Sequence, residues 1–310
     1  MLVQAARRLL VAIPTLFIII AAAFFLMRAA PGGPFDGERQ LPAEIEQRLK
    51  AEYNLDQPPL VQFQRYLGDL LQGDLGPSMK YKDKTVQQII SEGFPTSALI
   101  GASAITLALV VGSLIGIWAA LNQNKIQDNA AMAFAVVGVC LPPLVIAPIF
   151  SLMFGVQLQW LPTAGLYRDQ YTLSHLTLPV ITLALPQIAV ISRLMRASMI
   201  EAMRSNAIRT ARAKGLPEAQ IVWRHALPVA LIPIVSYLGP AISTVLTGGF
   251  VIETVYQLPG IGRQFTLAAL QRDYTLVMGV VIVYASLIIV FNMLADLMYG
   301  VLDPRARKAA

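Results

Sequence analysis

The sequence predicts an all-α integral membrane protein, built as a bundle of six membrane-spanning helices. Three observations lead to this prediction. Of the 310 residues, 56% are hydrophobic and only 14% are charged, which is far from the balance of a soluble domain. The apolar residues form uncharged runs long enough to cross the hydrocarbon core of a bilayer. The 24 Lys and Arg residues lie mainly beside these runs.

Six uncharged runs define the expected spans, which are residues 9–27, 94–124, 129–167, 176–192, 226–252 and 274–295. The first run follows Arg7 and Arg8, which is also the arrangement of a secretory signal peptide. Its length, and the presence of Arg28 and Pro31 where a cleavage site would lie, favour an uncleaved span.

Basic residues orient the predicted bundle. Residues 1–8, 122–128, 193–224 and 301–310 contain thirteen Lys and Arg, whereas the two short loops on the other side contain three. Because cytoplasmic loops are enriched in Lys and Arg, we expect both termini to be cytoplasmic. The expected divisions are an N-terminus with the first span, an external insertion, a five-span core and a cytoplasmic tail, at residues 1–30, 31–95, 96–300 and 301–310.

Residues 31–95 form a sizeable polar insertion with seven Lys and Arg and ten Asp and Glu. Apolar residues at helical spacing predict amphipathic helices over residues 42–53 and 58–71, which Asn54 and Gly73 would end. A third helix is expected over residues 85–92. So few large apolar side chains make a marginal independent domain, so we expect the insertion to pack on the mouth of the bundle.

Prolines interrupt the third, fourth and fifth predicted spans, at Pro142, Pro143, Pro148, Pro179, Pro186, Pro228, Pro233 and Pro240. Each proline removes a helix hydrogen bond, so kinks are expected there. The kinks either bend helices in a packed bundle or shape a central pathway, and both interpretations stay open. After the fifth span, the Gly- and Pro-rich residues 248–262 are typical of a re-entrant turn with a short helix.

The densest positive charge lies between the fourth and fifth spans, within residues 193–224. Residues 208–214 can form a short helix that Gly215 ends, and Pro217 and Glu218 suit the first turn of a second helix. We call this helix-turn-helix segment, residues 208–218, the elbow. The small side chains of Ala211 and Ala213 would let another protein approach the elbow closely. Cations around that contact would come from Arg209, Arg212 and Lys214.

Several function classes are disfavoured. The basic residues flank apolar runs, so membrane topology explains the pI of 9.5 more simply than nucleic-acid binding does. With His175, His225 and one cysteine, Cys140, the chain can build neither a His/Cys metal cluster nor an intrachain disulfide. It lacks a Gly-Lys dipeptide and therefore a P-loop for ATP.

Two alternatives from other functional classes remain beside these exclusions. An ion-coupled secondary transporter usually needs ionisable side chains inside its spans, and none is found near a predicted mid-span; Glu253 and Asp296 lie at predicted ends. A non-transporting membrane scaffold is the other alternative. No catalytic residues are expected in this chain. If ATP drives transport, another subunit must hydrolyse it.

Residues 209–228 resemble the EAA-loop pattern of ABC importer permeases, which is Glu-Ala-Ala, three residues, Gly, nine residues and Ile-x-Leu-Pro. The matching positions are Ala211, Gly215, Leu227 and Pro228. Three positions differ from the pattern: Arg209, Thr210 and His225. These differences resemble those of the peptide/nickel branch of these permeases. Segments similar to that branch recur along the chain, at residues 7–9, 14–15, 74–76, 95–96, 251–256, 258–262, 272–274 and 303–305. Within the branch, residues 30–42 are most similar to the oligopeptide permeases.

The resemblance implies a type I ABC importer permease fold and a membrane-spanning subunit of an ATP-driven oligopeptide importer in the bacterial cytoplasmic (inner) membrane. The implied partners are a second homologous permease subunit in a heterodimer, two cytoplasmic ABC ATPase subunits that bind ATP and Mg, an external solute-binding protein, peptide and lipid. A dipeptide or nickel permease of the same family is the alternative.

By the same resemblance, the elbow would be the coupling helix that contacts an ATPase, at about residues 196–228. The implied coupling residues are Arg209, Thr210, Ala211, Arg212, Lys214, Gly215, Leu216 and Pro217. The alternative interpretation is a loop whose positive charge only sets the topology. A peptide route should be lined by small and polar residues, and the candidates are Gln187, Ser192, Ser236, Ser243, Thr244 and Thr247. Such residues also serve helix packing.

Overall fold

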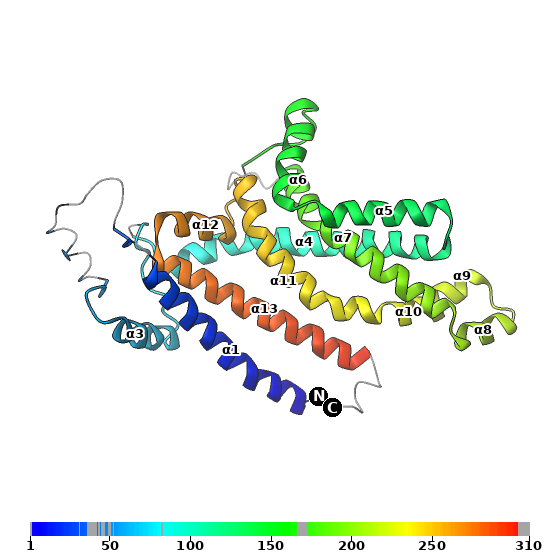
Figure 1. The fold of residues 1–310 in the computed structure, drawn as a ribbon, viewed down its shortest axis with the longest axis horizontal. Helices are drawn as coiled ribbons and strands as arrows, with labels where there is room; N and C mark the ends of the chain where they lie inside the picture. The colour runs from blue at the N-terminus through cyan, green and yellow to red at the C-terminus, as the bar shows by residue number, and fades with distance from the viewer. Residues whose placement is uncertain are drawn as a thin grey trace. The chain divides into compact units, whose positions relative to one another are not determined.

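In the computed structural model, the regular elements are helices throughout the residues that it describes. These residues are 2–30, 32–35, 53–81, 83–165 and 173–302, together with 42, 44, 47, 48 and 51. The helices, which include the π-helices η1 and η2, are α1 (Leu2–Ala29), α3 (Pro59–Leu71), α4 (Val86–Leu121), α5 (Ile126–Cys140), α6 (Pro143–Phe150), η1 (Ser151–Gln157), α7 (Leu173–Met203), α8 (Asn206–Ala213), α9 (Glu218–Ile221), η2 (Val222–Ala226), α10 (Leu227–Ala230), α11 (Ile232–Val255), α12 (Ile261–Gln271) and α13 (Tyr274–Leu302) (Figure 1).

The helices divide between two compact units. Unit 1 is built mainly from Ala98–Leu258, with the part of α13 from Ile288 onward, and unit 2 from Arg8–Ser97 and Pro259–Leu287. Among the residues that the structure describes, five helices are long and apolar enough to cross a membrane: α1, α4, α7, α11 and α13. A sixth span results if the bent pair formed by α5 and α6 with η1 counts as one.

The bent pair corrects the prediction of one kinked span over residues 129–167. The two halves meet at an angle of 101°. Pro142 precedes α6 and Pro143 occupies its first position, where a missing N–H costs nothing. The consecutive prolines therefore end one helix and begin another, which is a sharper break than a kink.

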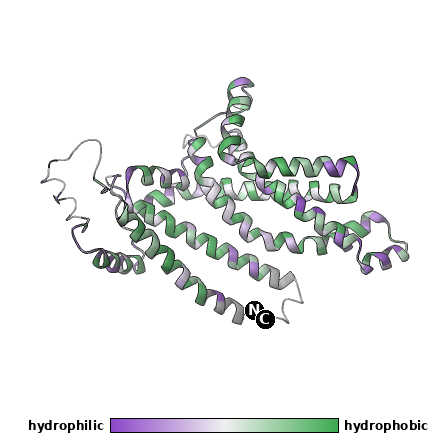
Figure 2. Ribbon diagram, viewed as in Figure 1, coloured by the Kyte–Doolittle hydropathy of each residue, from purple (hydrophilic) through white to green (hydrophobic). Residues whose placement is uncertain are grey.

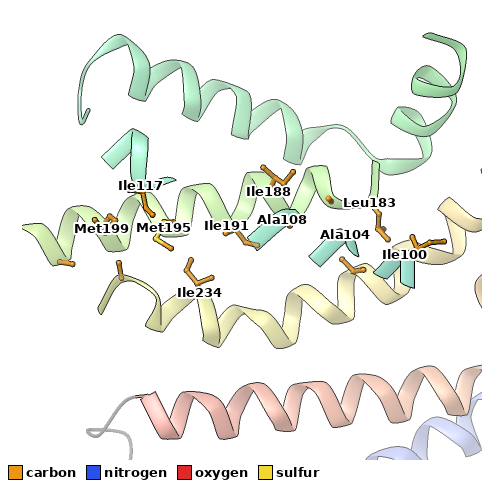
Figure 3. Packing of buried hydrophobic residues seen from close by; sticks show 14 of the residues in the cluster. Ile100, Ala104, Ala108, Ile117, Leu183, Ile188, Ile191, Met195, Met199 and Ile234 are labelled. Carbon is orange, nitrogen blue, oxygen red and sulfur yellow. The ribbon is translucent and has the colours of Figure 1, made fainter. Parts of the chain in front are cut away.

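The core of unit 1 lies along α7, which is more buried than the other candidate spans. Side chains of α4, α7 and α11 gather there (Figure 3), among them Ile100, Ala104, Ala108, Ile191, Met195, Met199 and Ile234. Glycines bring α4 close to α7. A Cβ at Gly116 would lie 2.6 Å from Met195 Cβ and from the Ser192 carbonyl oxygen, so a side chain larger than hydrogen has no room there.

The helix α7 is longer than the fourth predicted span. The prediction ended at Ser192 because Arg193 and Arg196 follow, yet the helix continues to Met203. The helix continues past the predicted span because arginine is a good helix former: its charge ends an apolar run without ending the helix.

In unit 2, α3 packs its apolar stripe on α1. The ring of Phe63 lies 5.2 Å from that of Phe24, centroid to centroid, in a cluster with Ile20, Met278 and Ile282. The helix predicted over residues 58–71 is confirmed, with Pro59 at its first position. The helix predicted over residues 42–53 falls largely outside the described residues.

The separate helix predicted over residues 85–92 was wrong. Those residues are the first turns of α4, which begins at Val86 and continues past Pro95. The turn expected within residues 248–262 lies at its end: α11 continues to Val255, Gln257 has a φ of 54°, and α12 begins at Ile261.

Candidate functional site

The elbow forms as predicted, from α8, a short turn and α9, beyond the end of α7 (Figure 1). The amphipathic helix α8 buries Ile208 and Ala211 against the rest of unit 1. Hydrophilic residues gather at this end of the unit, whereas α5 is hydrophobic over most of its length (Figure 2). The elbow is therefore anchored by its inner face and exposes a polar outer face.

Gly215 closes α8 with the hydrogen bonds of a Schellman motif. The N–H of Leu216 bonds the carbonyl of Ala211 at 3.3 Å, and the N–H of Gly215 bonds that of Arg212 at 2.9 Å. The φ of Gly215 is +76°, a left-handed conformation that glycine adopts without a Cβ penalty. No atom lies within 4 Å of a Cβ built there, so the turn tip faces open space.

An ion pair spans this turn. Nε of Arg212 lies 2.7 Å from Oε1 of Glu218, and Nη2 lies 3.2 Å from Oε2. The hydrogen bonds from Arg212 hold the pKa of the Glu218 carboxyl below its usual value, and they raise the pKa of Arg212. Both residues are exposed, and no carboxylate pairs with the exposed Arg209 or Lys214 among the described residues.

The structure places the eight predicted coupling residues on two faces. Those that are exposed are Arg209, Thr210, Arg212, Lys214, Gly215 and Pro217. Leu216 is half-buried and Ala211 is 6% exposed. Ala211 therefore packs inside the chain, and Ala213 is the small exposed residue beside the turn.

The six predicted lining residues also separate into two groups. Ser236, Thr244 and Thr247 are exposed along α11, and Ser236 and Thr244 donate to the carbonyls four residues back, at 3.2 and 2.9 Å. Because those hydroxyls donate to their own helix, their lone pairs remain as outward acceptors. Three further residues at helical spacing share this face, which sequence reasoning missed although the same spacing marks them: Pro233, Pro240 and Thr254. We call these six residues the α11 stripe.

The other three candidates lie within helix packing. Gln187 is 3% exposed and accepts a hydrogen bond from the hydroxyl of Tyr237 at 2.9 Å. Ser192 is 1% exposed and donates to the carbonyl of Ile188. Ser243 accepts a hydrogen bond from the amide of Asn292 at 3.2 Å.

Sequence reasoning also missed a buried ion pair, between Asp128 of α5 and Arg196 of α7. Both residues lie in segments that the sequence assigned to loops, so no periodicity marked them. Among the described residues there is no group of three or more His, Cys, Asp or Glu side chains that could hold a metal ion.

Comparisons with known proteins find membrane components of transport systems. Residues 112–308 match the family described as binding-protein-dependent transport system inner membrane component. The chain is 49% identical over 301 residues to the oligopeptide transport system permease protein OppB of Salmonella typhimurium, covering 97% of this chain and 98% of that one. It is 38% identical to the dipeptide transport system permease protein DppB of Bacillus subtilis, covering 94% of each.

Two solved structures share the fold. An ABC transporter involved in the import of the acidic polysaccharide alginate matches with a TM-score of 0.55 at 14% identity, over 83% of this chain and 97% of that one. An amino acid ABC transporter matches with a TM-score of 0.51 at 18% identity, over 71% of this chain and 94% of that one. At these identities the likeness concerns the fold alone.

Proposed function

The chain belongs to the family of binding-protein-dependent transport system inner membrane components, as a multi-pass permease rather than an enzyme, and we propose that it passes oligopeptides across the membrane. The observation that supports this substrate class is the 49% identity to an oligopeptide permease, along almost the whole of both chains. The dipeptide relative, at 38%, makes dipeptides the second candidate.

A permease of this kind works with an ATPase and a solute-binding protein. We propose the finer composition that the sequence implies: a heterodimer with a second homologous permease, and two cytoplasmic ATPases that bind ATP and Mg. Co-purification from the native locus in mild detergent tests it by mass and stoichiometry. A second permease and two ATPases per chain are expected, and a homo-oligomer without ATPases would contradict the proposal.

The elbow is our proposed contact with one ATPase. Its support is geometric: α8 is anchored by Ile208, and the turn at Gly215 is closed by backbone hydrogen bonds. The exposed cations Arg209 and Lys214 lie beside the turn and pair with no carboxylate in the described part of the chain. A rigid, exposed turn can receive a displacement from a partner and pass it to the spans. Both termini would lie on the same side as the elbow, in the cytoplasm, with residues 31–95 outside.

Gly215→Asp tests the contact. The new side chain would point into open space and bring a negative charge to the turn tip, so we expect peptide uptake and peptide-stimulated ATP hydrolysis to be lost while the chain stays in the membrane. Gly73→Asp is the matched control, because Gly73 also has a positive φ, +80°, and open space around it. Normal uptake by the Gly215 variant would contradict the proposal.

For the pathway, we propose the polar members of the α11 stripe as lining residues. The hydroxyls of Ser236 and Thr244 donate to their own helix, so their lone pairs can accept hydrogen bonds from peptide N–H groups without selecting a side chain. A competition assay in proteoliposomes that compares dipeptides with longer peptides distinguishes the two substrate classes. Uptake of dipeptides alone would replace the oligopeptide proposal by the second candidate.

A further inference from the structure

A buried ion pair joins α5 to α7 in unit 1. Asp128 lies in the first turn of α5 and its side chain is 1% exposed, whereas that of Arg196, on α7, is 25% exposed. Nε and Nη2 of Arg196 donate to the two carboxylate oxygens, at 2.5 and 2.6 Å. A guanidinium that meets a carboxylate with two N–H groups fixes both the distance and the orientation of the two elements.

The same carboxylate fixes the connection between α4 and α5. The backbone N–H of Asn124, whose φ is 63°, donates to Oδ2 of Asp128 at 2.9 Å. Just past the end of α7, Nη2 of Arg204 donates to Oε1 of Gln123 at 3.2 Å. The end of α7 therefore holds this connection at two points.

The elbow is joined more stiffly to α7 than to α11. Only Arg204 and Ser205 separate α7 from α8, and their N–H groups bond carbonyls of the last turns of α7, at 3.3 and 3.0 Å. On the other side, the π-helix η2, the four-residue α10 and Leu231 separate the elbow from α11. Prolines and π-helical turns interrupt the regular helix hydrogen bonds, so a displacement of the elbow passes preferentially to α7.

Beyond Asp128, the buried residues of α5 are small: Ala131, Ala135 and Gly138. Gly138 of α5 faces Ala189 of α7, with 3.1 Å between a built Cβ and the Ala189 Cβ. Small side chains form low ridges, so they resist sliding of one helix along the other less than large side chains would. The ion pair, at the elbow end of both helices, supplies that resistance.

We propose that the Asp128–Arg196 pair is a positioning device for energy coupling, which makes α5 and the α4–α5 connection follow α7 when the elbow is displaced. The inference rests on the proposed function, in which the elbow contacts an ATPase. A buried charge also needs a partner for stability alone, so the test must separate coupling from folding.

The test uses the complete transporter in proteoliposomes, with its binding protein and a labelled oligopeptide. The variants are Arg196→Lys, which keeps the charge but loses the two-point geometry, Asp128→Asn, and the exchange Asp128→Arg with Arg196→Asp. The readout is peptide imported per ATP hydrolysed, which does not depend on how much complex assembles. The control is Arg193→Lys, an exposed arginine of the same helix, α7, that lies outside the contacts with the α4–α5 connection.

We expect the ratio to fall about fivefold or more in both single variants while ATP hydrolysis persists. The charge-exchanged double variant should recover part of the lost peptide-to-ATP ratio, and the control variant should keep a ratio near that of the unaltered protein. An unchanged ratio in the single variants, even with less assembled complex, overturns the inference. If Gly215→Asp leaves uptake normal, the proposed contact between the elbow and an ATPase fails; if it abolishes uptake while the ratio stays unchanged in the pair variants, only this inference fails.

Discussion

The carboxylate of Glu218 accepts two hydrogen bonds from the guanidinium of Arg212, across the turn that joins α8 to α9. The two residues lie six positions apart, and the turn at Gly215 brings them together. The pair links α8 to the first residue of α9 across the turn. The geometry of the elbow therefore depends on charge as well as on its backbone.

Glu218→Lys should reduce uptake several-fold, because two cations would then repel each other across the turn. The double variant Arg212→Glu with Glu218→Lys restores opposite charges, and it should recover part of the uptake. Combining Glu218→Lys with Arg209→Glu is the control, since Arg209 is not the partner of Glu218. Equal uptake in the two double variants would contradict the expectation.

Gly116→Ala should destabilise unit 1 by about 1–3 kcal/mol, because the new Cβ overlaps the backbone of α7. Gly101→Ala on the same helix is the matched control. Its Cβ would meet only Val245 Cγ1, at 3.6 Å, so the substitution should be neutral or stabilise by up to about 1 kcal/mol through reduced chain entropy. Thermal unfolding in detergent measures both, and equal shifts in the two variants would refute the proposed close approach.

Asp273→Asn should loosen the 77–81 segment of unit 2. The Asp273 carboxylate is fully buried and accepts hydrogen bonds from the Ser78 hydroxyl and from the backbone N–H of Met79, Lys80 and Leu276. Each buried donor left without an acceptor costs about 1–3 kcal/mol. Faster hydrogen–deuterium exchange at residues 79 and 80 is the expected result.

Asp74→Asn is the control for that experiment. The exposed Asp74 carboxylate accepts from the N–H of Gly76 at 2.8 Å, which, with Gln87, holds its pKa below the usual value. Because water can replace these bonds, the variant should change exchange far less. Comparable exchange in the two variants would contradict the assigned role of Asp273.

Thr244→Val and Ser243→Ala should have opposite effects. Thr244 is exposed in the α11 stripe, so its loss should change peptide uptake with little effect on stability. Ser243 accepts from Asn292, so its loss should cost about 1 kcal/mol and leave uptake per assembled complex unchanged. Peptide uptake and unfolding temperature are measured on the same preparations of both variants. Changed uptake in Ser243→Ala, with lowered stability in Thr244→Val, would assign the lining role to Ser243.

The elbow could be predicted because its signals are local. A glycine after a short helical run, Gly215, marks the end of α8. Pro217 and Glu218, two and three residues later, mark the start of α9. The spans could be predicted for a similar reason, since apolar length alone determines them. The break before α6 was underestimated because two adjacent prolines were treated as a kink within one helix.

The Asp128–Arg196 pair could not be predicted because it joins residues 68 positions apart. Each residue alone looked like part of a charged loop, and only the packing of α5 on α7 removes the Asp128 carboxylate from water. The same applies to Ser243: helical spacing places it near Thr244, but the contact with Asn292 depends on how α13 packs on α11.

The bend between α5 and α6 has a practical consequence. The single cysteine of the chain, Cys140, is the last residue of α5 and is exposed directly before the bend. A thiol-reactive nitroxide or fluorophore would therefore attach at one known position without any change of sequence. Its spectrum, recorded with and without nucleotide, would report how the surroundings of the bend change during the transport cycle.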